Sequence, residues 1–180
     1  KPSDLENNAV TKFMKFTFPM TGGFDGTDKF VKSKAEFTNE AVHNESSDPN
    51  ENSVSSATIA SYRKAIDVME ERADVDIQLL SVPGIRNPKV SDYAMESVER
   101  RFDALYIMDI EERDAQNNVI LSDAPVSVSN TVAGFLNRDI DSSFAAAYAP
   151  DVIIKDPGTG TNVKCPLSVA VLGAMSLNDK

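Results

Sequence analysis

The sequence predicts an α/β fold in which a central, mostly parallel sheet carries helices on both faces, with a short hairpin and an N-terminal strand added. Two apolar runs, residues 77–82 and 104–110, are rich in Ile, Val, Leu and Tyr without strict alternation, which is typical of strands buried on both faces. One amphipathic segment, residues 88–102, lies between them. Two buried strands joined by a helix connect best in parallel, through a right-handed crossover. We therefore expect a β-α-β unit at the centre of the protein.

The joint between the first strand and its helix carries clear boundary signals. Pro83-Gly84 is expected to end the strand. Asn87 can cap the first N–H groups of the helix, and Pro88 fits the first helical position because that N–H has no intrahelical partner. The face expected to point inward holds Val90, Ala94, Val98 and Phe102. The face expected to reach water holds Glu96, Glu99, Arg100 and Arg101.

Ahead of this unit, residues 10–19 mix aromatic and β-branched side chains and are predicted to form a strand that Pro19 ends. A glycine-rich loop, 21–27, follows, and residues 28–53 are expected to form a long surface loop or a short helix. The apolar residues that could pin this stretch to the body are Phe30, Val31, Phe37 and Val42. A helix over residues 57–73, capped by Ser55 or Ser56, is predicted from the apolar stripe of Ile59, Tyr62, Ile66 and Met69.

The C-terminal third continues the alternation of strands and helices. Residues 111–118 are predicted to form a polar loop that turns at Asn117-Asn118, followed by a short edge strand, 119–121. A helix over 130–138 is expected, although Gly134 costs it about 1 kcal/mol relative to Ala. Residues 143–154 are predicted to form a strand broken at Pro150, and a turn over 156–162 leads to a hairpin partner, 163–165. Pro166 is expected to open a last helix. The residues predicted to point inward from these two helices are Val132, Phe135 and Leu136, then Val169, Leu172 and Met175.

The length of 180 residues suits one domain. We expect residues 57–180 to form one compact core, with the strand, loop and polar connection of residues 1–56 packed on it. The net charge of −10 would repel phosphate backbones and argues against free nucleic acid as a partner. No apolar run approaches the roughly 20 residues that span a bilayer, and the polar N-terminus does not resemble a signal peptide. Both ends of the chain read as cut, which suggests a fragment of a longer protein.

Acidic residues follow the second central strand and are the first candidates for chemistry. Asp109 is expected at the carboxyl end of a parallel strand, where α/β sheets place ligand sites, and Glu111, Glu112 and Asp114 follow it. Carboxylates clustered this closely could hold Mg²⁺ together with substrate phosphates. The simpler interpretation, a solvated loop in a chain that is acidic throughout, is favoured.

Other residues give no stronger signal. His43, the single histidine, lies among acids and is expected in an exposed loop, without a Gly-x-Ser-x-Gly nucleophile motif elsewhere. Gly22-Gly23-Phe24-Asp25-Gly26 lacks the spacing of a phosphate-binding loop, and Gly158 and Gly160 suit a hairpin turn. Cys165 cannot form an internal disulfide, suits a reducing compartment and is expected to be a small buried residue. We therefore predict no catalytic, cofactor-binding or metal-binding residue, no cofactor and no enzymatic activity.

Five stretches follow one another along most of the chain. They are Thr21-Gly22-Gly23-Phe24-Asp25-Gly26; residues 75–85, which end in Pro83-Gly84-Ile85; residues 99–109, with Arg101, Asp103 and Asp109; residues 142–151, with Tyr148 and Pro150; and residues 163–174, with Pro166, Ser168 and Gly173. In this order and spacing they resemble the contractile tail sheath proteins of bacteriophages and related contractile injection systems. Asp151 stands where the family pattern has Trp, and Leu167 where it has a second Pro, as in a divergent branch such as that of large phages.

The resemblance implies a subtilisin-like core domain without its chemistry, because fold alone does not confer activity. It implies a structural subunit, here without its C-terminal domain, that polymerises helically around a tail tube and drives DNA or effector delivery by contraction. The implied partners are other sheath subunits, the tail tube, and baseplate and terminator proteins, with no direct nucleic-acid contact and no membrane insertion. The implied location is the virion, after synthesis in the bacterial cytoplasm.

Two alternatives stay open at this point. One is an α/β enzyme that uses Asp109 and the following acids with Mg²⁺ on a phosphorylated small molecule. The other is a non-enzymatic adaptor or receptor-binding module of a phage particle, which would bind a different protein through an exposed apolar patch.

Overall fold

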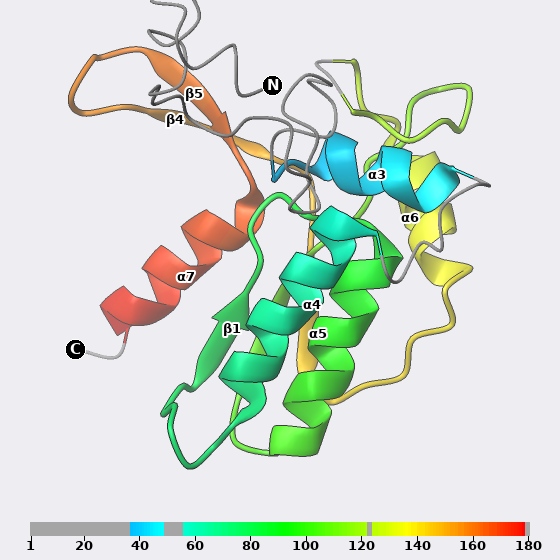
Figure 1. Cartoon of the computed structure of the whole chain (residues 1–180). Helices are drawn as coiled ribbons and strands as arrows, with labels where there is room; N and C mark the ends of the chain where they lie inside the picture. The colour runs from blue at the N-terminus through cyan, green and yellow to red at the C-terminus, as the bar shows by residue number, and fades with distance from the viewer. Residues whose placement is uncertain (1–36, 49–55, 122–123, 179–180) are drawn as a thin grey trace, which may run out of the picture.

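The computed structural model describes residues 37–48, 56–121 and 124–178. The predicted strand over residues 10–19 and the glycine-rich loop over 21–27 lie outside these ranges. Figure 1 shows the described elements, which follow the expected alternation of helices and strands. In chain order they are α3 (Asn39–Ser47), α4 (Ala57–Glu70), β1 (Leu79–Ser81), α5 (Pro88–Arg101), β2 (Leu105–Asp109), α6 (Val128–Leu136), β3 (Ala145–Tyr148), β4 (Val152–Lys155), β5 (Asn162–Cys165) and α7 (Leu167–Asn178).

Three strands form the central sheet in the order β1-β2-β3, and both neighbouring pairs are parallel. Leu79 lies opposite Leu105, and Tyr106 lies opposite Ala145. The strands β4 and β5 form a separate antiparallel pair. The prediction of an α/β fold with a mostly parallel sheet and a short hairpin is therefore confirmed, as is the β-α-β unit at its centre.

The pleat of β2 shows that helices cover both faces of this sheet. Successive side chains of a strand point to opposite faces. Tyr106, Met108 and Ile110 belong to the hydrophobic core that α4 and α5 share. Asp109, which has the opposite orientation, binds the first turn of α7. The pair α4 and α5 therefore lies on one face, and α7 approaches the other.

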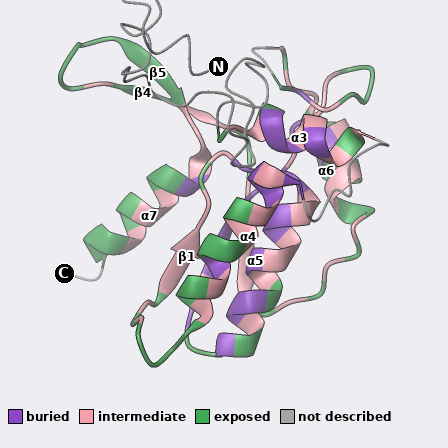
Figure 2. Cartoon of the chain, in the orientation of Figure 1, coloured by how far each residue is buried: buried purple, intermediate pink, exposed green. Residues whose placement is uncertain are grey.

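The main hydrophobic core lies between α5, α4 and the sheet. Figure 2 shows buried positions concentrated along α5, with further ones on α3 and α4. The core residues are Val42, Ile59, Ile66, Ile85, Val90, Ala94, Val98, Ala104, Tyr106, Met108 and Ile110. Residues from four helices and strands thus meet in one body, because each element buries one apolar stripe or face.

The helix α5 begins as predicted but ends differently. The Asn87 side chain accepts a hydrogen bond from the backbone N–H of Lys89, at 3.0 Å, and Pro88 takes the first helical position. Phe102, predicted to point inward, is 71% exposed, because the helix stops at Arg101 and Phe102 adopts a left-handed backbone with φ +62°. Arg101, predicted to reach water, is only 2% exposed. It binds the Asp103 carboxylate and the backbone carbonyls of Met69 and Val75.

The helix α4 ends at Glu70, three residues before its predicted end, and Met69 is 39% exposed instead of continuing the buried stripe. Its N-terminus shows a cap that the sequence did not reveal. The buried Glu45 carboxylate accepts hydrogen bonds from the backbone N–H groups of Thr58 and Ile59, at 3.0 and 3.2 Å. Glu45 belongs to α3, so residues 39–47 form the short helix that was one of the two options for this stretch.

Three predictions for the C-terminal third were wrong in detail. Residues 119–121 form no strand, since Val119 makes only a single bridge to Arg113. Val132 and Leu136 of α6 are exposed, and Phe135 alone of the predicted set packs on the core, because α6 meets the body along a narrow side. Val169 of α7 is also exposed, while Leu172 and Met175 are half-buried.

The predicted break at Pro150 and the hairpin are confirmed. The Ala149–Pro150 peptide bond is cis, and β3 and β4 belong to different sheets on either side of it. In the β4–β5 turn, the Asp156 carboxylate accepts from the Gly158 N–H at 2.9 Å, and Gly160 has φ +72°. No helix in the described part of the chain is long and apolar enough to cross a membrane.

Candidate functional site at the carboxyl end of the sheet

Asp109 ends β2 at the edge of the sheet where α/β proteins place ligand sites, and it is almost completely buried. One carboxylate oxygen accepts from the Ser168 backbone N–H at 3.0 Å. The other accepts from the Ser168 hydroxyl at 2.6 Å and from the Gly84 N–H at 3.1 Å. A carboxylate is stabilised at a helix N-terminus because the first N–H groups have no intrahelical partners. Asp109 therefore acts as the cap of α7 and ties that helix to β2.

Gly84 and Pro166 pack closely beside this cap. Gly84 has φ +77°, a conformation that a residue with a side chain rarely adopts. A Cβ atom built on Gly84 would lie 3.4 Å from Cγ of Pro166. The turn after β1, the end of β2 and the start of α7 are thus joined at one point.

A second group of polar side chains lies close to this end of the sheet. We call it the four-charge cluster, and it consists of Arg86, Glu112, Asp151 and Lys164. Arg86 Nη1 lies 3.4 Å from Glu112 Oε2, and Nη2 pairs with Asp151 Oδ1. Lys164 Nζ lies 3.7 Å from Glu112 Oε2 and 3.6 Å from Asp151 Oδ2. Two cations and two carboxylates therefore balance one another.

The four-charge cluster connects distant parts of the chain. Glu112 also accepts from the backbone N–H of Asp151 at 3.0 Å, and the Arg86 N–H donates to the Asn39 side chain at 2.9 Å. Arg86, Glu112 and Asp151 are nearly buried, whereas Lys164 of β5 is partly exposed. Buried charges are stable only when they are paired and hydrogen-bonded. The cluster therefore holds the base of the β4–β5 hairpin against the body.

The acids of the magnesium alternative do not converge, and Asp109 and Glu112 are buried instead of lying on the solvated loop that was favoured for them. Asp109 caps α7, and Glu112 belongs to the four-charge cluster. Asp114 accepts from the N–H groups of Gln116 and Asn118 in its own turn, and these bonds hold the pKa of that carboxyl below its usual range. Burial raises the pKa of Glu111, against the pull of Arg113. Within residues 37–48, 56–121 and 124–178, no group of three or more His, Cys, Asp or Glu side chains is placed to hold a metal ion.

The other residues considered as candidates from the sequence lie outside this region or have structural roles. His43 lies on α3 and is half-buried, so the prediction of an exposed loop was wrong. The single Cys165 is a free, half-buried thiol at the end of β5. Gly158 and Gly160 belong to the hairpin turn, as predicted. The glycine cluster around Gly23 lies outside the described residues.

Sequence reasoning missed Arg86 and Lys164 as members of this region. An Arg directly after Pro83-Gly84-Ile85, next to an otherwise apolar strand, is the only signal that could have indicated a buried ion pair there. Nothing in the sequence around Lys164 distinguishes it from an ordinary surface lysine, because its partners are distant in the chain.

Two exposed apolar surfaces lie beyond the site. The β4–β5 hairpin projects from the body in Figure 1 and exposes Ile153, Ile154 and Val163. The helix α7 is apolar around most of its circumference, yet Val169 and Leu177 are exposed. A helix that is apolar on all sides is normally buried, and exposed apolar groups of this size are typical of contact with another protein.

Comparisons with protein-family models, with curated proteins and with solved structures found no match to this chain. The function is therefore inferred from the geometry of the chain itself.

Proposed function

We propose that this chain is a structural subunit whose work is assembly, of the kind found in contractile tail sheaths, and not an enzyme. The observation that carries this proposal is the closed carboxyl end of the sheet. Asp109, the best candidate for chemistry, has both oxygens engaged by Ser168 and Gly84. A scaffold benefits from such a closed junction, whereas a catalytic site of an α/β sheet needs it open to a ligand.

Three of the stretches that carry the resemblance to sheath proteins meet at this junction. Gly84 of the Pro-Gly-Ile turn binds Asp109, and Asp109 binds Ser168 of the last stretch. Arg86 follows the same turn and pairs with Asp151, which follows Pro150 in another of these stretches. Arg101 and Asp103 form an ion pair at 2.8 Å within a third. Gly84, Asp109 and Ser168, which belong to three of the stretches quoted for the resemblance, therefore hold one another in place, whereas Arg86 lies outside those stretches and Asp151 departs from the family pattern.

A contractile sheath requires stiff subunits, because the subunits move as rigid bodies between a long and a short state. The Asp109 cap and the four-charge cluster fix α7 and the base of the hairpin to the sheet. The elements that project from this fixed body are the hairpin and α7, which also expose apolar side chains. Heterologous contacts through such surfaces would build a helical polymer.

The helix α4 also has an acidic face, but two of its carboxylates are not free for contacts between subunits. Glu70 accepts from two nitrogen atoms of Arg100, at 2.7 and 2.6 Å, and Asp67 accepts from the Tyr93 hydroxyl. These carboxylates are engaged within the chain. We therefore assign the apolar hairpin and α7 the main role in assembly, with acidic residues acting on register and salt sensitivity.

Immunogold electron microscopy tests the proposal. Antibodies raised against the purified chain would be applied to contractile-tailed particles from the organism that encodes it. Label along the whole tail is expected for a sheath subunit. Label at one end only would favour the adaptor alternative, and absence of label from particles would contradict both structural hypotheses.

A matched pair of variants tests the surface. We expect the chain alone to be a monomer or weak oligomer at micromolar concentration, with any self-association reduced by Ile153→Lys on the hairpin. Val128→Lys on α6, another exposed apolar position, should leave it unchanged. Sedimentation would measure both. Long tubular polymers formed by the chain alone would show that these residues already contain every element needed for assembly.

A further inference from the structure

The outer half of the β4–β5 hairpin combines exposed apolar side chains with a free cation. We call it the hairpin patch, and it consists of Ile153, Ile154, Lys155 and Val163. Ile153 is 72% exposed, and the other three residues are exposed as well. No acid in the described part of the chain forms an ion pair with Lys155, and the one acid of the hairpin, Asp156, is held by the Gly158 N–H and the Thr159 hydroxyl of its own turn. The hairpin patch is therefore apolar and basic.

A second surface, at the end of α4 and on the segment that leads into β1, combines exposed apolar side chains with free acids. We call it the acidic edge, and it consists of Val68, Met69, Glu71, Asp74 and Asp76. Val68 is 53% exposed, and the three acids are exposed as well. Arg72, the cation of this segment, pairs with Asp103 at 3.2 Å, and among the described residues no cation pairs with the three acids. The acidic edge is therefore apolar and acidic.

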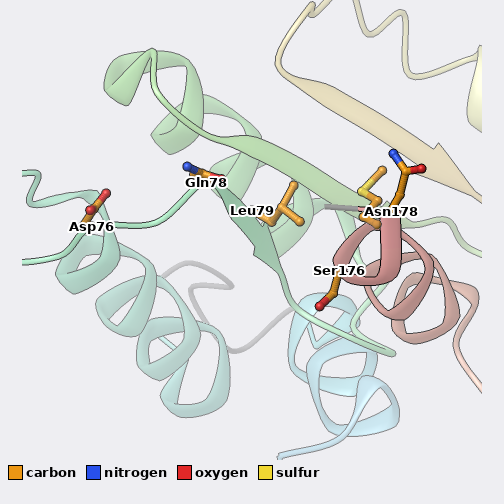
Figure 3. A pocket seen from close by; sticks show the side chains of 6 residues that line it. Asp76, Gln78, Leu79, Ser176 and Asn178 are labelled. Carbon is orange, nitrogen blue, oxygen red and sulfur yellow. The ribbon is translucent and has the colours of Figure 1, made fainter. Parts of the chain in front are cut away.

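The groove beside the acidic edge brings no cation to it. Asp76 lines this groove, which has a volume of about 640 Å³. Figure 3 shows Asp76 and Gln78 on the segment that enters β1, with Ser176 and Asn178 on α7 as the other wall. The helix α7 contains no charged residue. The wall across the groove therefore leaves the charge of the acidic edge unbalanced.

The hairpin patch and the acidic edge lie at opposite ends of the sheet. The acidic edge precedes β1, so it lies where the parallel strands begin. The hairpin follows the carboxyl end of β3, and the four-charge cluster holds its base there. Figure 1 shows the hairpin and the end of α4 at opposite ends of the body. The two surfaces of one chain therefore cannot meet, whereas the surfaces of two chains can.

We propose that the hairpin patch of one copy docks on the acidic edge of the next copy. The apolar side chains of the two surfaces cover one another, and Lys155 pairs with Asp74. A contact between two different surfaces does not close on itself, so the copies add head to tail into an open file or a helix. This contact rests on the proposed function, because it specifies how the subunits of an assembly meet.

Charge selects this pairing among the contacts that two copies could make. Two hairpin patches that faced each other would place Lys155 against Lys155, and two acidic edges would place carboxylates against carboxylates. The exposed apolar face of α7 offers no acid to Lys155. Copies that each carry a net charge of −10 repel one another, and a basic surface that meets an acidic one offsets this repulsion locally.

Exchange of the two charges tests the contact. Sedimentation of the whole chain at up to about 1 mM measures its association. We expect Lys155→Glu and Asp74→Lys each to weaken association at least about tenfold, because each places like charges across the contact. An equimolar mixture of the two variants should regain association, since the altered surface of each complements the other. The double variant should regain it as well.

Matched variants control for net charge. Lys89→Glu and Asp141→Lys change the net charge by the same amounts at positions outside both surfaces and should alter association little. Circular dichroism checks that each variant is folded. The unaltered chain supplies a second test, which holds even if a variant fails to fold: its association should fall at least about tenfold between about 50 and 500 mM salt, because the paired charges are exposed.

Three results would overturn the contact: no association of the unaltered chain at about 1 mM, association that salt does not weaken, or single variants whose mixture behaves like either variant alone. Its failure is distinguishable from failure of the proposed function. Antibody label along whole tails, together with charge variants that associate normally, would refute this contact alone. Association regained in the mixture, without label on any particle, would refute the sheath function and leave the contact standing.

Discussion

Asp109 and Ser168 form a double hydrogen bond between the end of β2 and the first turn of α7, with the carboxylate accepting from both the N–H and the hydroxyl of the serine. We expect Asp109→Asn to lower the free energy of unfolding by about 2–3 kcal/mol. The amide removes the charge at a helix N-terminus and turns an N–H₂ donor toward groups that are already donors. Denaturant unfolding measures this, with exposed Asp74→Asn as the control, for which about 0.5 kcal/mol or less is expected.

The same residue allows a test of the magnesium hypothesis. A thermal-shift titration with Mg²⁺ and nucleotides is expected to give no saturable stabilisation that depends on Asp109, because all its hydrogen bonds come from the protein. A ligand that binds the native state raises the unfolding temperature by mass action. Saturable stabilisation that Asp109→Asn abolishes would instead favour the enzyme alternative.

The four-charge cluster predicts a large effect from a single change. Arg86→Met leaves Glu112 and Asp151 with only the partly exposed Lys164 as a cation, and we expect it to destabilise the protein by about 3–5 kcal/mol. Arg72→Met is the control, since its pair with Asp103 is solvent-exposed and should contribute at most about 1 kcal/mol. Chemical denaturation compares the two. Equal small losses would show that the cluster contributes little to stability.

The β-α-β unit could be predicted from the sequence because its signals are local. The Asn87 cap, Pro88 at the first helical position and the two apolar runs each act within a few residues of the boundary they mark. The hairpin could be predicted equally well, because a turn after Asp156 and a break at Pro150 depend on neighbouring residues alone. Local chemistry of this kind determines where elements begin and end.

The misplaced residues have non-local partners. Arg101 was expected in water because charged residues usually face solvent, but carbonyl groups from the end of α4 and from Val75 satisfy it in the interior. Asp109 and Glu112 are close in sequence and were expected on a solvated loop, with a metal site as the alternative, yet both are buried. The pleat of β2 and the path of the following loop send them to different partners, which only the folded chain reveals.

The carboxyl group of Glu111 is expected to make the stability of the protein depend on pH, with a defined sign. Burial raises the pKa of its carboxyl, although Arg113, Arg138 and His43 act in the opposite direction. A carboxyl with a raised folded-state pKa favours folding below its unfolded pKa, and that contribution is lost as the pH rises through the folded pKa. Glu111→Gln should therefore be more stable than the parent at pH 7, by a margin that shrinks as the pH falls through the folded-state pKa and has vanished below about pH 4. The free energy of unfolding would be measured across this pH range, with exposed Glu71→Gln as the control for the lost charge. A stability margin with the opposite dependence on pH would show that burial is not the cause.

Gly134 lies inside α6 although glycine weakens helices, and Arg113 explains its presence. A Cβ on Gly134 would lie 2.4 Å from Arg113 Nε, and Arg113 is held in place by its hydrogen bond to the Asn117 carbonyl at 2.9 Å. We expect Gly134→Ala to destabilise the protein by about 1 kcal/mol, despite the roughly 1 kcal/mol that Ala should contribute to a helix.

A double-mutant cycle separates these two effects. In an Arg113→Ala background, the obstacle is absent and Gly134→Ala should stabilise the protein by up to about 1 kcal/mol, so the sign of the change reverses. Gly173→Ala in α7 is the matched control, because nothing lies within 4 Å of its Cβ position and the helical gain should appear without any second substitution. If Gly134→Ala gave the same stabilisation in both backgrounds, Arg113 could not be the reason that glycine occupies this position.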